Sequence, residues 1–283
     1  MDIHDLLGRL PFKALKPQPL VTVVRLSGVI GDGRGSGMQR SLSLAALAGT
    51  LEKAFKPKHL VAVALAINSP GGSPVQSSLI AGRIRQLANE KKVPVFAFVE
   101  DVAASGGYWL ATAADEIYVD RASIVGSIGV VSAGFGFAQL IEKIGIERRV
   151  HAQGSRKAML DPFRPEQADD VTRLLALQVE LHDGFKAEVR RRRGEKLKGD
   201  DATLFEGDIW TGHKAVELGL VDGIGDLRSH LRSRFGDKVK MTVVGGGDSW
   251  LRRRFGLASA PGSWAQDVLM AIEERLHWSR YGF

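Results

Sequence analysis

The residue types best suited to chemistry in this sequence gather at positions 101–109, Asp-Val-Ala-Ala-Ser-Gly-Gly-Tyr-Trp. An apolar run, Val93–Val99, precedes Ser105, and a short helical pattern, Tyr108–Ala114, follows it. Ser105 is therefore expected at a strand-to-helix turn, where the free backbone N–H groups of a helix start lie close to its hydroxyl. Such a turn suits a nucleophilic serine. It also suits an ordinary helix N-cap, because serine is a preferred cap residue.

A serine nucleophile needs a base, and the sequence offers few. The seven histidines form no His-Glu-x-x-His motif, and no Gly-x-Ser-x-Gly elbow of an α/β-hydrolase occurs. Cysteine is absent, which removes disulfides, thiolate metal sites and cysteine nucleophiles. Lys157 is the candidate base, because the apolar residues 158–160 follow it and an expected strand, Glu147–Ala152, leads toward it. A lysine acts as a base only when neutral, which requires burial away from carboxylates; a surface lysine is the alternative.

An α/β framework is expected to position these residues. Near-continuous apolar runs separated by helical patterns predict a parallel sheet, in which sites lie at the carboxyl ends of strands. Both glycine-bearing turns, Asn68–Ser73 and 101–107, fall at such ends, so we expect them to meet in space. The runs are Leu20–Ile30, Leu60–Ile67 and Val93–Val99, and the helical patterns between them are Ser41–Lys56 and Val75–Ala88.

The second half of the chain continues the alternation and carries one long amphipathic helix, expected from Pro165 to about Arg193. We interpret its end, Arg190–Arg193, as solvated and favourably placed against the helix dipole. A nucleic-acid patch is the alternative, but it lacks interleaved aromatic residues. The other expected elements are strands at Ile117–Val119 and Val239–Val244, a glycine-punctuated apolar stretch at Ser123–Val131, and helices at Phe137–Ile144 and Gly212–Leu218.

Composition points to a globular protein with a basic surface, with a net charge of +7 and a pI near 9.7. The segment 31–37 alternates glycine with polar residues but is no phosphate loop, because the chain has no Gly-Lys dipeptide. No signal peptide or membrane span is visible, so we expect a cytoplasmic protein, soluble or peripheral at the inner face of the plasma membrane. The basic, tryptophan-containing tail, residues 250–283, suits either an interfacial membrane helix or a helix that docks on a neighbouring subunit.

Five motifs occur together and in order, and the set resembles the signal peptide peptidase A (SppA) family of Ser-Lys serine peptidases. That family shares the ClpP/crotonase superfamily fold, with stacked ββα units and a mostly parallel sheet flanked by helices. The resemblance covers about residues 20 to 245. Its motifs are Asn68-Ser-Pro-Gly-Gly-Ser73, Ala104-Ser-Gly-Gly-Tyr-Trp109, Gly126-Ser-Ile-Gly129, Lys157, and Trp210-Thr-Gly-His-Lys-Ala215 with Gly219-Leu-Val-Asp222.

The resemblance implies a role for each matched position. Ser105 becomes the nucleophile, Lys157 the general base, and Ser127 a hydroxyl that orients the lysine amine. The N–H groups of Gly72 and Gly106 form the oxyanion hole, and the neighbouring Gly71 and Ser73 contact the substrate. No metal or organic cofactor is implied. The domain expectation is an N-terminal extension (1–19), a peptidase domain (20–249) and the helical tail (250–283).

The resemblance also implies a homo-oligomeric ring, in some members with sites completed by neighbouring subunits. Members commonly carry a membrane anchor and cut signal-peptide remnants. No anchor is visible here, so we expect a peptidase that cuts apolar, unfolded segments or such remnants. Any contact with a membrane face would be made by the tail. No nucleic-acid partner is expected. Two alternatives remain: a proteolytically inactive scaffold or binding subunit with the same fold, and a crotonase-type acyl-CoA enzyme, which needs no Ser-Lys pair.

Overall fold

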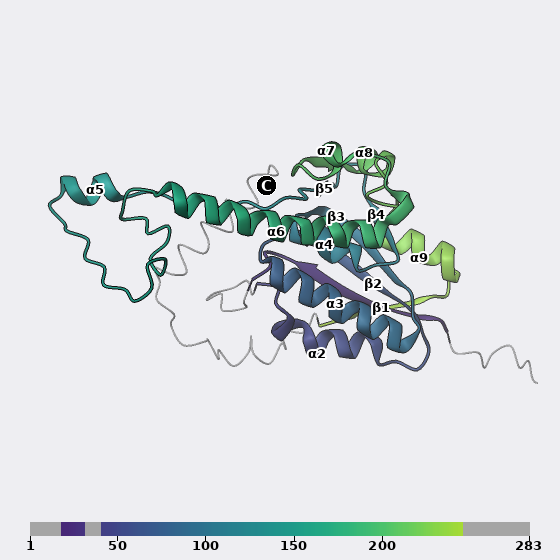
Figure 1. Ribbon diagram of the computed structural model, residues 1–283. Helices are drawn as coiled ribbons and strands as arrows, with labels where there is room; N and C mark the ends of the chain where they lie inside the picture. The colour runs from purple at the N-terminus through teal and green to yellow at the C-terminus, as the bar shows by residue number, and fades with distance from the viewer. Residues whose placement is uncertain (1–17, 32–40, 246–283) are drawn as a thin grey trace, which may run out of the picture.

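The computed structural model describes residues 18–31 and 41–245 (Figure 1). Strands and helices alternate along the first half of the chain, as the apolar runs predict. The strands are β1 (Leu20–Ser27), β2 (Leu60–Ser69), β3 (Val95–Ala104), β4 (Glu116–Val119), β5 (Ile124–Gly126), β6 (Ile209–Thr211), β7 (Gly223–Ile224) and β8 (Lys240–Val244). The helices are α2 (Leu44–Phe55), α3 (Pro74–Lys91), α4 (Gly106–Thr112), α5 (Ala138–Lys143), α6 (Ala168–Arg193), α7 (Asp201–Leu204), α8 (Gly212–Glu217) and α9 (Leu227–Phe235), with a 3₁₀ turn, η2, at Gly194–Lys196.

One sheet joins all of these strands, in the order β6-β5-β3-β2-β1-β8, with β4 beside β3 and β7 beside β4. Every pair is parallel except β5 with β6. Between β2 and β3 the register shifts: Ile67 pairs with Val99, whereas Ser69 pairs with Ala103. Such a bulge bends the end of a strand. Here it lies directly before Ser105. The expected α/β fold with a mostly parallel sheet flanked by helices is confirmed.

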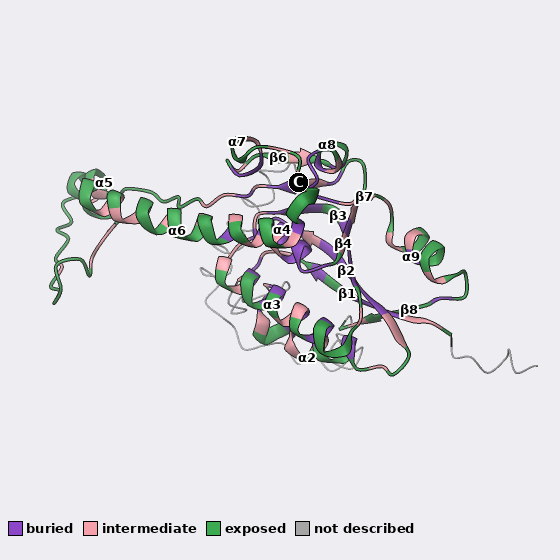
Figure 2. Ribbon diagram, turned by 45° about the vertical axis from the view of Figure 1, so that its right-hand side comes forward, coloured by how far each residue is buried: buried purple, intermediate pink, exposed green. Residues whose placement is uncertain are grey.

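Two hydrophobic cores cover the two faces of the sheet. The larger core lies beneath α2, α3, α4 and the C-terminal half of α6, and it includes Leu51, Ile80 and Phe185. The smaller core lies beneath α9, with Phe96 and Phe98 from β3 packed against Leu231. Alternate residues from Val95 to Val99 of β3 thus enter opposite cores, which is why this part of the strand is apolar throughout. The exposed Glu100 and Asp101 follow it. We call the sheet and the helices packed on it the body; Figure 2 shows its strands largely in the buried colour.

Residues 132–167, which we call the arm, stand away from the body. The arm holds α5 and otherwise irregular chain, and α6 joins it to the sheet (Figures 1 and 2). No residue of α5 is buried, whereas the far end of α6 buries Phe185, Val189 and Arg193. The arm therefore has no core of its own within this chain.

Two expectations fail in this half of the chain. The expected strand at Glu147–Ala152 is irregular, because the arm offers no neighbouring strand to pair with it. The interpretation of Arg190–Arg193 as a solvated helix end is wrong for Arg192 and Arg193, whereas Arg190 and Arg191 are exposed. Arg193 is only 4% exposed, and all four arginines pair with carboxylates or carbonyls of the body or of α6 itself. Helix α9 and the short strand β6 were not anticipated at all.

Parts of the expected organisation lie outside the described residues. These are most of the extension 1–19, most of the glycine loop 31–37, and the tail 250–283. Across residues 18–31 and 41–245, no helix is both long and apolar enough to cross a membrane.

Candidate active site

Ser105 occupies the turn between β3 and α4, as the sequence predicts. Its backbone has φ +51° and ψ −122°, a conformation that L residues rarely adopt and that costs about 1–3 kcal/mol. Two hydrogen bonds hold it there: the Ser105 N–H donates to the Gly126 carbonyl at 2.8 Å, and the Ser105 carbonyl accepts from the Trp109 N–H at 3.0 Å. The hydroxyl caps no helix N–H, so the N-cap interpretation does not account for this serine. The strained turn leaves it partly exposed.

The second glycine-bearing turn lies against the first, as expected from its place at the end of β2. A Cβ on Gly71 would stand 2.8 Å from the Ser105 Cβ and 2.9 Å from the Gly106 nitrogen. A Cβ on Gly72 would stand 2.1 Å from the Ile30 carbonyl oxygen, and both glycines have positive φ. Only glycine fits at either position, for steric and conformational reasons together.

The buried Ser69 fixes the Gly71–Gly72 turn through its hydroxyl, and the half-buried Ser73 follows the turn. The Ser69 hydroxyl donates to the Gly28 carbonyl at 2.7 Å and accepts from the Gly71 N–H at 3.3 Å. Ser69 is fully buried, and its carbonyl lies so close to Gly107 that a Cβ there would meet it at 2.3 Å. On the other side, Ser73 caps α3 by accepting from the Gln76 N–H. The Ser73 hydroxyl is thus committed to the helix start.

Two backbone N–H groups remain free at the place where the turns meet. Neither the Gly72 N–H nor the Gly106 N–H donates to any acceptor among the described residues. The Gly72 nitrogen lies 3.4 Å from where a Cβ of Gly106 would stand, so the two donors are neighbours. Paired, pre-positioned N–H groups beside a serine are the arrangement that stabilises an oxyanion.

Ser127 lies one position beyond the pairing of Ala104 with Gly126, as Ser105 does on the adjacent strand. The two serines are therefore side by side at the end of a parallel ladder. Ser127 also has a positive φ, +52°, and its N–H donates to the Asp208 carbonyl at 2.6 Å. The structure thus brings together Ser105, Ser127 and the two free N–H groups.

Lys157 is not brought to this place within one chain. It lies in the arm, in an irregular segment, and its side chain is exposed rather than buried as a neutral lysine would require. Among the described residues, no base is hydrogen-bonded to the Ser105 hydroxyl. Within the single chain Lys157 is thus a surface lysine, the alternative that the sequence left open, because the arm projects away from the sheet (Figure 1).

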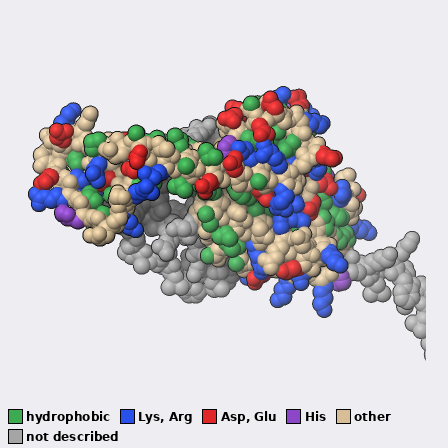
Figure 3. Space-filling view, in the orientation of Figure 1, with side chains coloured by type: hydrophobic (Ala, Val, Ile, Leu, Met, Phe, Trp, Pro, Cys, Tyr) green, Lys and Arg blue, Asp and Glu red, His purple; other side chains and the backbone are tan. Residues whose placement is uncertain are grey.

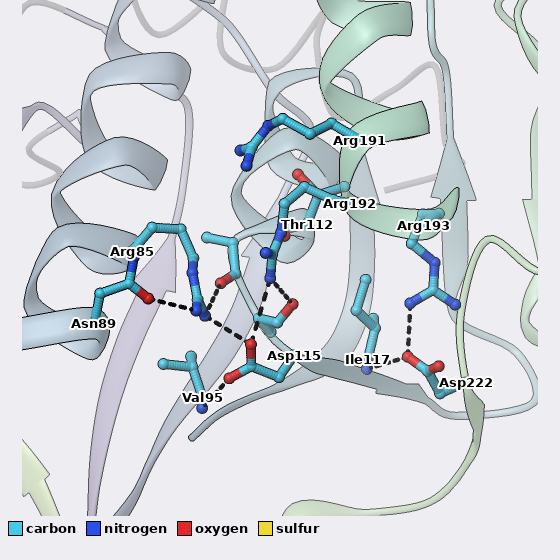
Figure 4. Close-up of polar contacts among 12 residues, drawn as sticks. Arg85, Asn89, Val95, Thr112, Asp115, Ile117, Arg191, Arg192, Arg193 and Asp222 are labelled. Atoms are coloured by element: carbon cyan, nitrogen blue, oxygen red, sulfur yellow. Dashed lines mark hydrogen bonds and ion pairs between the residues drawn. The ribbon is translucent and has the colours of Figure 1, made fainter. Parts of the chain in front are cut away.

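The C-terminal end of α4, the helix that follows Ser105, is hydrogen-bonded to α6 (Figure 4). Arg192 donates to the Thr112 and Ala114 carbonyls at 2.7 Å each, satisfying acceptors at the end of α4. Arg85 of α3 donates to the Ala113 carbonyl and pairs with Asp115. Two cations from different helices therefore fix the C-terminal end of α4.

The motif Gly219–Asp222 has a structural role. Asp222 accepts from the buried Arg193 and from Lys196, both at 2.7 Å, and from the Ile117 N–H. Burial alone would raise the pKa of Asp222, but these hydrogen bonds outweigh it and hold the pKa below its ordinary value. The Leu220 carbonyl accepts from the Tyr108 hydroxyl at 2.6 Å, and burial raises the pKa of that phenol. The motif thus connects α4 to α6, because it accepts hydrogen bonds from Tyr108 of α4 and from Arg193 of α6.

Sequence reasoning missed several residues that shape the site. Asn68 bridges the two turns: its amide donates to the Asp101 carboxylate at 2.6 Å, and its carbonyl accepts from the Val102 N–H. His182 of α6 contacts the Ile128 carbonyl at 3.1 Å, next to Ser127. Asn68 lies inside a quoted motif and could have been singled out. Nothing local in the sequence marks His182, because its contact spans 54 residues.

Comparison with known protein families identifies the family to which this chain belongs. A model of peptidase family S49 matches residues 87–237, more than half of the chain and the stretch that carries Ser105, Ser127 and Lys157. The chain belongs to peptidase family S49. The resemblance to SppA-type peptidases is thereby confirmed.

Curated relatives of this S49 chain include proteases and one differently named pair. The chain is 32% identical over 213 residues to the chloroplastic serine protease SPPA of Arabidopsis thaliana, covering 73% of this chain and 31% of that protein. It is 33% identical over 214 residues to protease 4 of Haemophilus influenzae, covering 73% and 33%. It is 52% identical over 281 residues to a Brucella abortus protein named Na(+)/H(+) antiporter NhaA, covering 96% and 38%. The chain thus spans only a third to two fifths of the length of these relatives.

Proposed function

We propose that this chain is a serine endopeptidase that uses a Ser-Lys dyad to cut apolar, unfolded segments or signal-peptide remnants. The observation that carries the proposal is the strained Ser105 turn facing the free N–H groups of Gly72 and Gly106, within a member of family S49. An unpaired hydroxyl, held at a conformational cost beside two oriented donors, is poorly explained by folding alone.

The proposed reaction begins with Lys157 neutral. Its amine takes the proton of the Ser105 hydroxyl as the oxygen attacks the peptide carbonyl. The carbonyl oxygen becomes an oxyanion, which the Gly72 and Gly106 N–H groups stabilise; one such donor is typically worth about 3 kcal/mol. The lysine then returns the proton to the departing amine, leaving an acyl-Ser105 ester that water hydrolyses. Ser127, beside Ser105, is proposed to orient the amine.

The lysine of the dyad is proposed to come from a neighbouring copy of the chain. The arm exposes six large apolar side chains, Phe135 among them at 79% exposure, and the adjoining half of α6 exposes four more. Exposed apolar surface of this extent is typical of an interface. Figure 3 shows further hydrophobic side chains on the body where α3 begins, and Val75 and Leu79 are exposed there. Packing of an arm on a neighbour's body would bury both surfaces and enclose Lys157.

The assembly is tested by size-exclusion chromatography with light scattering. Phe135→Glu is expected to dissociate the oligomer and remove peptidase activity, because it puts a charge into the proposed interface. Lys143→Glu, a change at another exposed position on the same arm, is the control and should leave both unchanged. A wild-type chain that is monomeric and fully active would contradict the shared site.

Peptidase activity is tested with a fluorogenic peptide that has a small or apolar residue before the scissile bond. Wild type is expected to cleave it. Ser105→Ala and Lys157→Ala are each expected to abolish cleavage, whereas the exposed controls Ser78→Ala and Lys143→Ala retain it. Activity that survives Ser105→Ala would overturn the proposal.

The second candidate is a proteolytically inactive scaffold, and one observation favours it: Lys157 is exposed and lies in the arm, whereas Ser105 lies in the body. A scaffold would be folded and oligomeric yet inert toward every peptide, and Ser105→Ala would leave its partner binding unchanged. The same peptide assay therefore separates the two functions.

The Brucella proteins named as antiporters share nearly all of this chain, including the S49 match. For the shared region we propose peptidase activity, because the family match and the Ser105 turn both lie inside it. More than half of those proteins lies outside the shared region, and the antiporter name carries no proposal for this chain.

Peripheral membrane contact through residues 250–283 rests on sequence alone. Three tryptophans and the run Arg252–Arg254 suit the interface of an anionic bilayer. Liposome flotation of the full chain and of a chain ending at residue 249 tests this. Equal flotation of both, or none by the full chain, would end the hypothesis.

A further inference from the structure

Helix α6 contacts the elements that carry the candidate site through three residues along its length. Near its C-terminal end, Arg192 holds the carbonyls at the end of α4 (Figure 4). Two turns earlier, the Phe185 ring stacks on Trp109 of α4, with ring centroids 4.7 Å apart and planes 15° from parallel. Nearest the arm, His182 Nε2 lies 3.1 Å from the Ile128 carbonyl oxygen. The first two contacts hold the Ser105 helix, and the third holds the Ser127 turn.

The Ser127 turn depends on a few external ties. Its positive φ is a conformation that the chain would leave if it were free to relax. On one side the Ser127 N–H donates to Asp208, and on the other the Gly126 carbonyl accepts from Ser105. Among the described residues, His182 supplies the one side-chain hydrogen bond to residues 126–129.

We propose that His182 is a positioning residue of the active site. With its proton on Nε2, the imidazole donates to the Ile128 carbonyl and so fixes the turn that carries Ser127. Because the Gly126 carbonyl accepts from the Ser105 N–H, the same turn also sets the nucleophile. His182 acts through the backbone and does not touch Ser105. The role rests on the proposed peptidase function, since it is defined by the alignment of Ser105 with Ser127.

The contact also connects the arm to the active site. His182 lies on the helix that leaves the body toward the arm, between the exposed Leu181 and the buried Phe185. A shift of the arm on assembly would move α6, and His182 would pass that shift to the Ser127 turn. His182 thereby links the Ser127 turn to the helix that leads to the arm.

The test uses the full chain and two substitutions of His182. His182→Phe keeps a planar ring but loses the N–H donor, whereas His182→Gln keeps a donor at similar reach. His213→Phe is the matched control, because His213 is exposed on α8. Hydrogen exchange by mass spectrometry is measured for peptides covering 126–131 and, for reference, β2. Kinetic constants for the fluorogenic peptide are measured on the same samples.

We expect His182→Phe to speed exchange in 126–131 and not in β2. We also expect it to lower kcat about ten- to hundredfold with little change in KM, because misplacement of reacting groups acts on the chemical step. His182→Gln should recover most of both. Unchanged exchange in His182→Phe, or equal losses in the Phe and Gln variants, would overturn the role. If wild type itself cleaves nothing, the peptidase proposal fails, and the exchange result still decides whether His182 holds the turn.

Discussion

The body and the arm of this chain divide the candidate machinery between them. The body holds Ser105, Ser127 and the free N–H groups on a bulged, mostly parallel sheet with buried cores on both faces. The arm holds Lys157 on irregular chain and exposes its largest apolar side chains. The serines and the oxyanion donors, which need accurate geometry, thus lie in the body, beside its buried cores. Lys157, which needs burial to be neutral, lies in the arm, where no residue is buried within this chain.

That difference indicates that the body supplies the accurate geometry that catalysis needs, and that the arm is the region proposed to direct assembly. A strained serine persists only if its surroundings over-determine it, which requires a rigid sheet. A neutral lysine requires a desolvated place, and a second copy of the chain is able to provide one. The comparison leads to four predictions, from the largest expected effect to the smallest.

The first prediction tests whether body and arm come from different subunits. Ser105→Ala and Lys157→Ala are each inactive alone, but when mixed and reassembled they should regain about a quarter of wild-type activity, because about a quarter of adjacent pairs then combine an intact serine with an intact lysine. The measurement is peptide hydrolysis after subunit exchange.

Mixing Ser105→Ala with a Ser105→Ala/Lys157→Ala double variant is the control and should stay inactive. If the first mixture also stays inactive although subunits exchange, the serine and lysine act within one chain or not at all.

The second prediction concerns the two turns of the body. Gly72→Ala would push a methyl group against the Ile30 carbonyl and displace the free N–H, so kcat should fall about 10²–10³-fold, the usual loss for one oxyanion donor. Gly82→Ala is the matched control: it lies within α3 with open space around it, and should raise the free energy of unfolding by about 0.5–1 kcal/mol without changing kcat. Equal kcat for both variants would argue against an oxyanion role for this turn.

The third prediction concerns the join between the two regions. Arg193→Met leaves Asp222 without its buried partner and should lower the free energy of unfolding by about 3 kcal/mol, measured by urea titration. Arg191→Met, whose ion pair with Glu188 is exposed, should change it by less than about 1 kcal/mol.

The pH dependence should follow the lowered pKa of Asp222. Its contribution is present above the unfolded-state pKa of about 4 and is lost as pH falls through the lower, folded value. Arg193→Met should flatten that acidic slope. A stability difference that persists unchanged into strong acid would show that packing, not the ion pair, fixes α6.

The fourth and smallest effect lies on the opposite face of the sheet. His230 of α9 packs on Tyr118, with ring centroids 3.9 Å apart, and burial lowers the pKa of this histidine against the opposing influence of Glu116. Because the unfolded chain then binds the proton more readily, Tm should rise as pH rises toward and through about 6.5. His230→Phe should remove this rise, measured by thermal unfolding at several pH values.

The same variant separates folding from catalysis. The pH profile of peptide hydrolysis should keep its wild-type shape in His230→Phe, because α9 packs on the face of the sheet opposite to α4. A displaced activity profile would mean that the two faces of the sheet are coupled.

The sequence by itself determined the body and the chemistry-bearing motifs. Continuous apolar runs placed β1, β2 and β3 to within a few residues, since a strand buried on both faces leaves no room for polar side chains. The glycines at 71 and 72 marked a close backbone approach, and parallel topology then required their turn to meet Ser105. The order of the motifs indicated the family.

Tertiary structure decided what no local pattern encodes. The Arg190–Arg193 run looks like a solvated helix end, yet the body supplies buried acceptors for Arg192 and Arg193. Glu147–Ala152 has the composition of a strand, but a strand needs a neighbour, and the arm has none. Lys157 precedes an apolar run in the sequence and still lies exposed, because burial depends on what packs against a segment. For the same reason the contact between His182 and Ile128 exists only after folding, when the sheet brings residues 54 positions apart to one place.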